Sequence, residues 1–186
     1  MKTFGSQAGV TLYELMTALS VIAILMSMSA PSYSEFINKR KVAAGANLIA
    51  TFFENVKMEA VKRNAFATVS FQVADNGTDW CLGAMLGKEV ACDCLAEVEE
   101  CKIDGVTTIL SNETFAQFSH LVTTFNTGTI SYDPVRGILT NPAGSVAMEV
   151  RHSDEDFRVD VSVNAAGNVR KCTPSGYKPV GFATCI

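Results

Sequence analysis

The sequence of 186 residues predicts an α+β protein, in which one long N-terminal helix packs on an antiparallel, β-rich globular head. Two observations predict this fold class. An apolar run over residues 12–30 leads into a segment with helical periodicity that ends near Arg63. Beyond Arg63, apolar and polar residues alternate with the period of strands.

Composition limits where the protein resides and what it can bind. The formal net charge of -4 gives no general attraction to nucleic acid or anionic lipid, so binding to either would need a local patch. An even number of cysteines follows the apolar run, as expected if everything after it is exported to an oxidising compartment. The six cysteines are Cys81, Cys92, Cys94, Cys101, Cys172 and Cys185.

The apolar run over residues 12–30 has about the length of a helix that crosses a bilayer. Glu14 lies near its start, where an ionised carboxylate left in lipid costs about 2.5 kcal/mol or more. The run could be a secretory signal peptide cut after Ala30, but Pro31 would follow that cut. It could also be an uncleaved anchor, or the start of a mature chain after removal of a short polar leader that ends at Gly9.

The helix is predicted to run from Leu12 to Arg63 and to bend at residues 28–31, because Pro31 removes a backbone hydrogen bond. Its second half is amphipathic, which predicts that one side covers the sheet. The apolar side carries Val42, Gly45, Leu48, Ile49, Phe52, Phe53, Val56 and Ala60. The polar side carries Asn47, Glu54, Lys57 and Lys62.

The first strand is predicted where Val69, Phe71 and Val73 alternate with polar residues. A turn at residues 75–77 then predicts a hairpin with residues 80–85. Further strands are predicted at residues 106–110, 121–125, 129–132, 137–140, 146–151 and 157–163. The last two read as a hairpin across residues 152–156.

The sequence offers little for catalysis or metal binding. His120 and His152 are the only imidazoles, and neither belongs to a nucleophile motif. His152, Ser153 and Asp154 are adjacent residues, which cannot form a triad with one another. Cys92 and Cys94 lack the second cysteine pair or nearby histidine of a zinc site. The prediction is therefore no enzyme, no cofactor and no metal.

The stretch G-V-T-L-Y-E-L from Gly9, followed by the apolar run and Ala30-Pro31-Ser32-Tyr33, resembles the processing motif of type IV pilins and pseudopilins. The usual motif is G-F-T-L-x-E, so Val10 replaces a phenylalanine. The resemblance implies that a prepilin peptidase cuts after Gly9 and that the new N-terminus at Val10 is methylated. It divides the chain into a prepilin leader (residues 1–9), a transmembrane and polymerisation helix (10–31) and an extracytoplasmic globular pilin head (32–186).

This resemblance also implies a location and partners. The protein would be a single-pass inner-membrane protein with its head in the periplasm, and would then join other major and minor pilins in a pilus. Glu14 would pair with the N-terminal amine of a neighbouring subunit, since opposite charges attract strongly in low dielectric. The alternative is a neutral glutamic acid that reaches the membrane interface.

Six cysteines can pair in many ways, and the sequence does not choose among them. Cys172 and Cys185 are the only cysteines of the tail, so their pairing is the simplest expectation. For the other four we expect the pairs Cys81–Cys92 and Cys94–Cys101.

The tail holds one candidate binding patch. Arg170 and Lys171 end a predicted strand, and Lys178 lies inside the loop that Cys172 and Cys185 would close. Such cations could bind DNA phosphates without reading sequence, with Tyr177 and Phe182 available for stacking. An ordinary solvated strand end is the alternative.

Three further stretches refine the resemblance: Trp80-Cys81-Leu82-Gly83, Cys92-Asp93-Cys94 and residues 167–172. Together they resemble the minor pilins of the FimT/GspH family, and FimT-like members more than GspH-like ones. Some FimT-like proteins bind DNA through a G-R-x-R element, of which this chain keeps the second arginine, as Arg170. The resemblance implies a minor pilin that supports type IV pilus assembly and DNA uptake in natural transformation. The alternatives are a GspH-like pseudopilin of type II secretion and a membrane-anchored binding module that never polymerises.

Overall fold

The structure is a computed structural model that describes residues 9–74, 79–96, 100–111, 121–124, 128–140, 146–152 and 157–185. At residues 28–32, 74, 79, 121–124 and 146–152 it describes the backbone alone. The chain divides into two units, Met1–Ile37 and Asn38–Ile186, each of which is described by itself.

The first unit contributes the start of helix α1 (Leu12–Arg63), whose two ends agree with the prediction. The helix continues through Pro31, as expected, while the bend predicted at residues 28–31 stays a prediction. Apart from the half-buried Ile37, the long apolar side chains described in this unit are exposed, among them Leu12, Leu19 and Met26. No helix found among the described residues combines the length and hydropathy of a membrane span.

The second half of α1 buries one apolar stripe in the head. Buried residues recur at alternating spacings of four and three, the repeat that keeps side chains on one face of a helix. They are Val42, Ala46, Ile49, Phe53, Val56 and Ala60. The prediction for Leu48 is wrong, because this side chain is 41% exposed. Leu48 lies about 100° around the helix from Ile49, and the small Ala46 and Ala50 fill the contact instead.

The first sheet has the strand order β5-β2-β1-β7. Its strands are β1 (Ala67–Ala74), β2 (Asp79–Leu86), β5 (Ile109–Ser111) and β7 (Gly128–Tyr132). The antiparallel register of β1 with β2 runs from Ala67 opposite Leu86 to Ala74 opposite Asp79, which confirms the first predicted hairpin. Its turn, at residues 75–77, lies outside the described residues.

The strand predicted at residues 106–110 is two short strands. β4 (Val106–Thr107) pairs with β3 (Lys102–Ile103) in a small hairpin, whereas β5 pairs with β2. The chain changes partner at Thr108, whose backbone N–H donates to the carbonyl of Cys101 at 2.9 Å and whose carbonyl accepts from Ala84 at 2.9 Å. Thr108 therefore separates the β3–β4 pair from the β2–β5 pair, because its backbone bonds to one residue on each side.

The second sheet has the strand order β10-β9-β8-β6. Its strands are β6 (Leu121–Thr124), β8 (Val146–His152), β9 (Arg158–Val163) and β10 (Val169–Cys172). The antiparallel pairing of β8 with β9 confirms the last predicted hairpin, although residues 153–156 of its connection lie outside the described residues. In β9 the valines alternate as buried residues with half-buried polar ones, as predicted.

The strand predicted at residues 137–140 is wrong. A turn from Asp133 to Gly137 closes with a backbone hydrogen bond of 2.9 Å, and Gly137 has a φ of 62°. Only an isolated bridge between Tyr132 and Leu139 follows among these residues. Because Gly137 closes this turn, it cannot also begin a strand that runs to residue 140.

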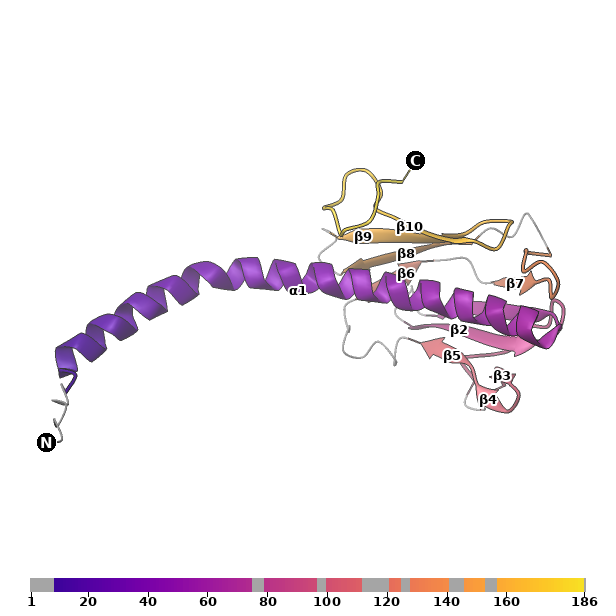
Figure 1. Cartoon of the computed structure of the whole chain (residues 1–186), viewed down its shortest axis with the longest axis horizontal. Coiled ribbons are helices and arrows are strands. Elements are labelled where there is room, and N and C mark those ends of the chain that lie inside the picture. The colour runs from indigo at the N-terminus through magenta and orange to yellow at the C-terminus, as the bar shows by residue number, and fades with distance from the viewer. Residues whose placement is uncertain are drawn as a thin grey trace, which may run out of the picture. The chain divides into compact units, whose positions relative to one another are not determined.

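The core of the second unit gathers side chains from α1 and both four-stranded sheets. Phe53 and Val56 of the helix join Trp80 and Leu82 of the first sheet and the buried valines of β9. Figure 1 shows the second half of α1 lying across the strands of this unit. The predicted α+β fold class, a long N-terminal helix packed on an antiparallel head, is confirmed.

Candidate functional site

The start of α1 is held by a reciprocal pair of hydrogen bonds between Thr11 and Glu14. The backbone N–H and the hydroxyl of Thr11 donate to Glu14 Oε2 at 3.0 Å and 2.9 Å, and the N–H of Glu14 donates back to Thr11 Oγ1 at 3.3 Å. Since α1 begins at Leu12, this is a capping box with Thr11 as the N-cap. It also places the carboxylate at the positive end of the helix dipole.

This contact gives Glu14 a role within its own chain that we did not predict. The signal was in the sequence, because T-x-x-E before an apolar run is the signature of a capping box. Both described hydrogen bonds end on Oε2, and a carboxylate accepts at both of its oxygens. The capped carboxylate therefore keeps the capacity to accept from an ammonium group.

Gly9 and Val10, the predicted processing residues, precede the helix and are exposed. No other heavy atom lies within 4 Å of the position that a Cβ on Gly9 would occupy. The bond between these residues thus lies outside the helix and is exposed within the described part of the chain.

The polar face of β1 is covered by the loop that follows β2 and carries Cys92 and Cys94. Thr68 donates to the carbonyl of Gly87 at 2.7 Å, and Ser70 Oγ accepts from the backbone N–H of Cys92 at 2.9 Å. Gln72 Oε1 accepts from the backbone N–H of Cys94 at 3.2 Å. The polar residues of this strand thus hold the loop in place.

These hydrogen bonds explain the disulfide pairing. The structure has Cys81–Cys94 and Cys92–Cys101, so the expected pairs Cys81–Cys92 and Cys94–Cys101 are wrong. Gln72, which binds Cys94, lies opposite Cys81 in the β1–β2 register. Ser70, which binds Cys92, lies opposite Gly83, and Gly83 packs beneath the sulfur of Cys101. Pairing follows the register of the strands rather than proximity in sequence.

The C-terminal loop is closed by the Cys172–Cys185 disulfide, as expected. Thr173 bonds through its backbone to Ala183 at 2.8 Å and to Cys185 at 3.0 Å, which folds the loop back on itself. Val180 is buried, and Phe182 packs against the core. The loop is therefore part of the folded head.

The three predicted tail cations do not share one surface. In the β9–β10 register Arg170 lies opposite Ser162 and Lys171 opposite the buried Val161, so the two cations point to opposite faces of the sheet. Lys171 Nζ donates to Asn47 Oδ1 of α1 at 2.8 Å and lies 5.6 Å from the ring centre of Phe182.

The other two tail cations are exposed. Arg170 lies on the outer face of the sheet, and Lys178 Nζ lies 5.6 Å from the ring centre of Phe157. A residue that we did not predict, Arg158, shares the outer face with Arg170 by strand alternation. Its guanidinium lies 5.3 Å from the ring centre of Tyr177, and its Nε donates to Asp160 at 2.8 Å.

His120 lies outside the described residues, and His152 is described by its backbone alone. Among the described side chains no group of three potential metal ligands is found. Every cysteine, Cys92 and Cys94 included, is in a disulfide.

A long N-terminal helix whose second half packs on antiparallel sheets is a pilin-like α+β fold. The sequence model of the family described as "Type II transport protein GspH" matches residues 45–167. The chain therefore belongs to the GspH family. Its members are non-enzymatic minor pilins or pseudopilins of type IV pili or type II secretion, which co-assemble with other pilins.

Two solved structures are similar to this chain, both crystal structures of the type IV minor pilin FimU from Pseudomonas aeruginosa. The first is 13% identical, covers 80% of this chain and 96% of its own, and has a TM-score of 0.45. The second is 14% identical, covers 76% of this chain and 95% of its own, and has a TM-score of 0.43. No curated protein matches the chain.

Proposed function

We propose that the chain is a prepilin that is cut after Gly9 and assembled as a minor pilin of a type IV pilus. The observation that carries the proposal is the placement of Gly9 and Val10 directly before the capped start of α1. A peptidase needs an exposed, non-helical bond, and both residues are exposed and precede the helix. Cutting there would leave a free amine at Val10, beside the Thr11–Glu14 capping box.

Glu14 is proposed to receive the amine of a neighbouring subunit during assembly. Thr11 holds the carboxylate in one orientation before the neighbour arrives, so little side-chain freedom is lost on contact. In the low dielectric of the membrane the attraction between the two charges is strong, and an unpaired carboxylate is costly. The contact would thus favour assembly over a subunit left alone in lipid.

The test compares Glu14→Gln with Glu14→Ala in cells that make pili. Gln still caps the helix but lacks the charge, whereas Ala lacks both. We expect both variants to be cut after Gly9, as read from the mass of the mature N-terminus. Both should be reduced about tenfold or more in sheared pili, which corresponds to at least ~1.4 kcal/mol. Thr17→Val, a change on the same turn of α1, should assemble normally. Normal incorporation of Glu14→Gln would contradict the proposal.

A pseudopilin of type II secretion is the second candidate, favoured by the description of the matching family. A deletion strain separates the two. Loss of pili with normal secretion supports the minor pilin, and loss of secretion with normal pili supports the pseudopilin. If the wild-type chain is absent from sheared pili and both phenotypes are normal, a non-polymerising membrane-anchored module explains the chain better.

We also propose that the head binds DNA without sequence specificity and thereby supports uptake in natural transformation. Supporting observations are the exposure of Arg170 and Lys178 and the placement of Arg158 on the same sheet face as Arg170. Tyr177, whose ring centre lies 5.3 Å from the guanidinium of Arg158, adds an aromatic surface for bases. Lys171 contributes less, because its amine bonds to Asn47.

A gel shift of the full chain in detergent, repeated at several salt concentrations, tests DNA binding. Arg170→Ala should weaken binding and lower the slope of log K against log salt by about one. Lys171→Ala should change binding less. Arg136→Ala, which removes an exposed arginine from the turn at residues 133–137, is the matched control. Absence of a shift at low salt would rule out the binding.

A further inference from the structure

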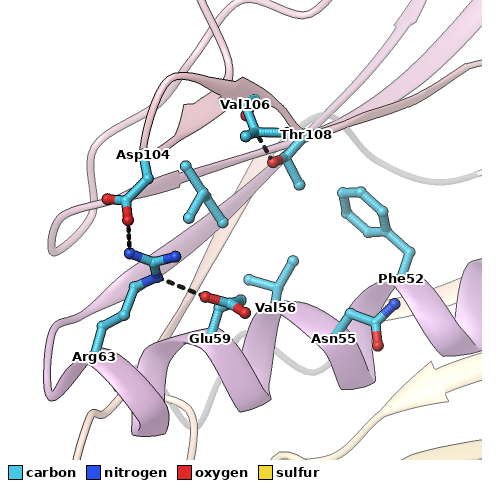
Figure 2. A pocket seen from close by; sticks show the side chains of 9 residues that line it. Phe52, Asn55, Val56, Glu59, Arg63, Asp104, Val106 and Thr108 are labelled. Carbon is cyan, nitrogen blue, oxygen red and sulfur yellow. Dashed lines mark hydrogen bonds and ion pairs between the residues drawn. The ribbon is translucent and has the colours of Figure 1, made fainter.

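A cavity of about 310 Å³ lies between the second half of α1 and the β3–β4 hairpin (Figure 2). Its walls are mainly apolar, and its charged groups lie toward one end. It is lined by Phe52, Asn55, Val56, Glu59, Arg63, Ile103, Asp104, Val106 and Thr108. The volume lies at the lower end of the range for small-ligand pockets, about 300–1,000 Å³, and is enough for one large side chain.

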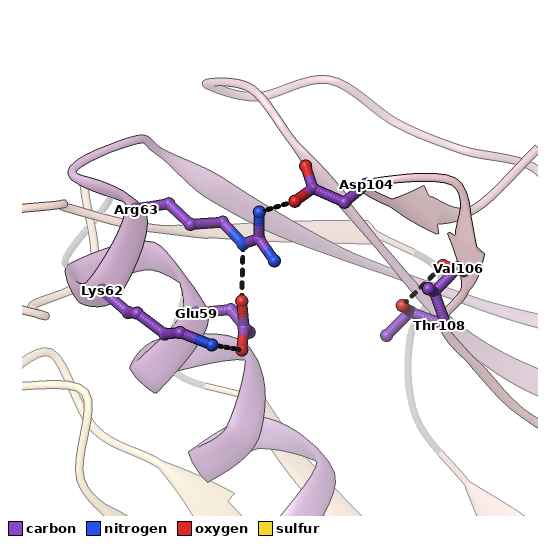
Figure 3. Close-up of polar contacts among 6 residues, drawn as sticks. All are labelled: Glu59, Lys62, Arg63, Asp104, Val106 and Thr108. Atoms are coloured by element: carbon purple, nitrogen blue, oxygen red, sulfur yellow. Dashed lines mark hydrogen bonds and ion pairs between the residues drawn. The ribbon is translucent and has the colours of Figure 1, made fainter.

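Charges gather at the polar end of this cavity (Figure 3). Arg63 Nε donates to Glu59 Oε2 at 2.5 Å, and Arg63 Nη1 donates to Asp104 Oδ2. The hydrogen bond from Arg63, followed by the one from Lys62, lowers the pKa of Glu59, so its carboxylate is charged at neutral pH. The lining thus holds two carboxylates for one guanidinium. Lys62 Nζ is 3.3 Å from Glu59, but Lys62 lies outside the lining and its side chain is 70% exposed.

The wall made by the hairpin is preformed. Asp104 and Gly105 have φ values of 52° and 75°, the left-handed pair that a tight two-residue hairpin turn needs. Ile103 is buried, and Cys101 just before β3 is fixed by its disulfide. Val106, in contrast, is 67% exposed although it is apolar. The cavity is therefore open to solvent beside Val106, and its hairpin wall is fixed in place. A fixed wall loses little conformational entropy when a ligand or side chain fills the cavity.

We propose that this cavity receives a lysine or arginine side chain of a neighbouring pilin-family subunit. The aliphatic stem of such a residue would pack on Phe52 and Val106, and its charged end would meet the carboxylates of Glu59 and Asp104, for which the lining itself supplies one guanidinium. A purely apolar side chain would take the two carboxylates out of water without donating a hydrogen bond to either, which is unfavourable. Complementarity of charge therefore selects a cationic occupant over an apolar or acidic one.

The inference rests on the proposed function, since a neighbouring subunit is present only in an assembled filament. The test places a photo-cross-linking amino acid at Val106 of the full chain, in cells that assemble filaments. Val135 is the negative control, because it is 76% exposed and lies in the turn at residues 133–137 instead. Leu19, exposed on the first half of α1, is the positive control for assembly.

We expect Val106 to cross-link to a pilin-family subunit with at least five times the yield of Val135. The cross-linked peptide, identified by mass spectrometry, should contain a lysine or arginine close to the linked residue. Asp104→Asn removes the charge but suits the left-handed backbone, and should lower the yield about fivefold. Glu54→Gln, on the exposed side of α1, should leave it unchanged.

The outcomes separate this inference from the proposed function. If Leu19 cross-links to pilins and Val106 does not exceed Val135, the cavity is not a docking site and the minor-pilin function stands. If neither Leu19 nor Val106 cross-links, both proposals fail. The cationic occupant is ruled out if the peptide cross-linked to Val106 has no lysine or arginine near the linked residue. It is also ruled out if Asp104→Asn leaves the cross-linking yield unchanged.

Discussion

Gly83 of β2 is the residue whose missing side chain makes room for a disulfide. A Cβ atom there would lie 2.9 Å from Cys101 Cβ and 3.0 Å from Cys92 Sγ, and it would also meet Cys101 Sγ. Both cysteines are buried and cannot shift into solvent. We expect Gly83→Ala to lower the free energy of unfolding by about 2–3 kcal/mol, the cost of overpacking a core. Urea unfolding measures the loss.

The control for Gly83→Ala is the same substitution in a chain that carries Cys92→Ala and Cys101→Ala. Without the two sulfur atoms the added methyl group has more room, so its cost should fall. An equal cost in both backgrounds would mean that Gly83 matters for another reason. Thiol titration of the single variant should also detect more free cysteine than in the wild type.

Tyr132 is fully buried in the core, and its hydroxyl has no hydrogen-bond partner among the described residues. Burial, followed by the nearby charge of Glu54, raises the pKa of the phenol above its usual value of about 10. The neutral phenol is thus favoured in the folded state. This contribution to stability is complete below about pH 10 and is lost as pH rises beyond it.

We therefore expect Tyr132→Phe to leave the free energy of unfolding at pH 7 unchanged or to raise it by about 1 kcal/mol, since an unpaired buried hydroxyl is removed. The variant should also lose less stability than the wild type between pH 9 and about pH 11. Denaturant unfolding at several pH values measures both effects. A loss of more than about 1 kcal/mol at pH 7 would reveal a partner for the hydroxyl.

At the scale of elements, the end of α1 is joined to the β3–β4 hairpin through Arg63. Hydrogen bonds donated by Arg63 and then by Lys62 lower the pKa of Glu59. The bonds that Arg63 donates to Glu59 and then to Asp104 raise the pKa of Arg63. A carboxylate with a lowered pKa stabilises the folded state above its unfolded pKa, and this contribution is lost as pH falls through the folded pKa. Glu59→Gln should therefore be slightly less stable than the wild type at pH 7.

The difference between Glu59→Gln and the wild type should shrink as pH falls below the usual glutamate pKa of about 4.3, because a carboxylate with a lowered pKa gains its proton only below that value. Glu54→Gln, on the same helix, is the matched control and should not reproduce the effect. Thermal unfolding followed by circular dichroism at pH 7 and pH 3.5 is sufficient. If the stability difference between Glu59→Gln and the wild type were the same at both pH values, the charge of Glu59 would not be its cause.

The periodicity of apolar residues was enough to predict the elements that keep one buried face along their whole length. The helix from Leu12 to Arg63 and the alternation in β9 follow directly from the apolar spacing. Periodicity failed where tertiary contacts decide. Thr108 ends β4 because its backbone bonds to both Cys101 and Ala84, and no local pattern encodes that pair of partners.

The candidate sites were predictable to different degrees for similar reasons. Glu14 stood out as a charge in an apolar run, and its cap by Thr11 was available from local spacing. The disulfide pairs around β1 depend on which loop residue bonds to Ser70 and which to Gln72, a contact between segments about 20 residues apart. The cavity beside α1 requires the β3–β4 hairpin, whose short strands give no periodic signal.

At the scale of the whole molecule, the buried core lies entirely within the second unit, Asn38–Ile186. The core cluster begins at Val42 on α1 and ends at Val180 in the C-terminal loop. The three disulfides also lie within this unit. Folding of the head should therefore not depend on the residues that we propose for processing and assembly, Gly9, Val10 and Glu14.

This separation predicts that a fragment of residues 38–186 unfolds cooperatively, with a free energy of about 5–15 kcal/mol, as for ordinary domains. A matched fragment of residues 48–186 lacks Val42 and Ala46, which are fully buried. It should be less stable by at least about 2 kcal/mol, from the lost apolar burial alone. Fluorescence of Trp80, the single tryptophan and a buried one, reports both transitions in urea. Equal stability of the two fragments, or a gradual transition in the longer one, would mean that the core is not self-contained. An independent core lets Glu14 variants test assembly without destabilising the head.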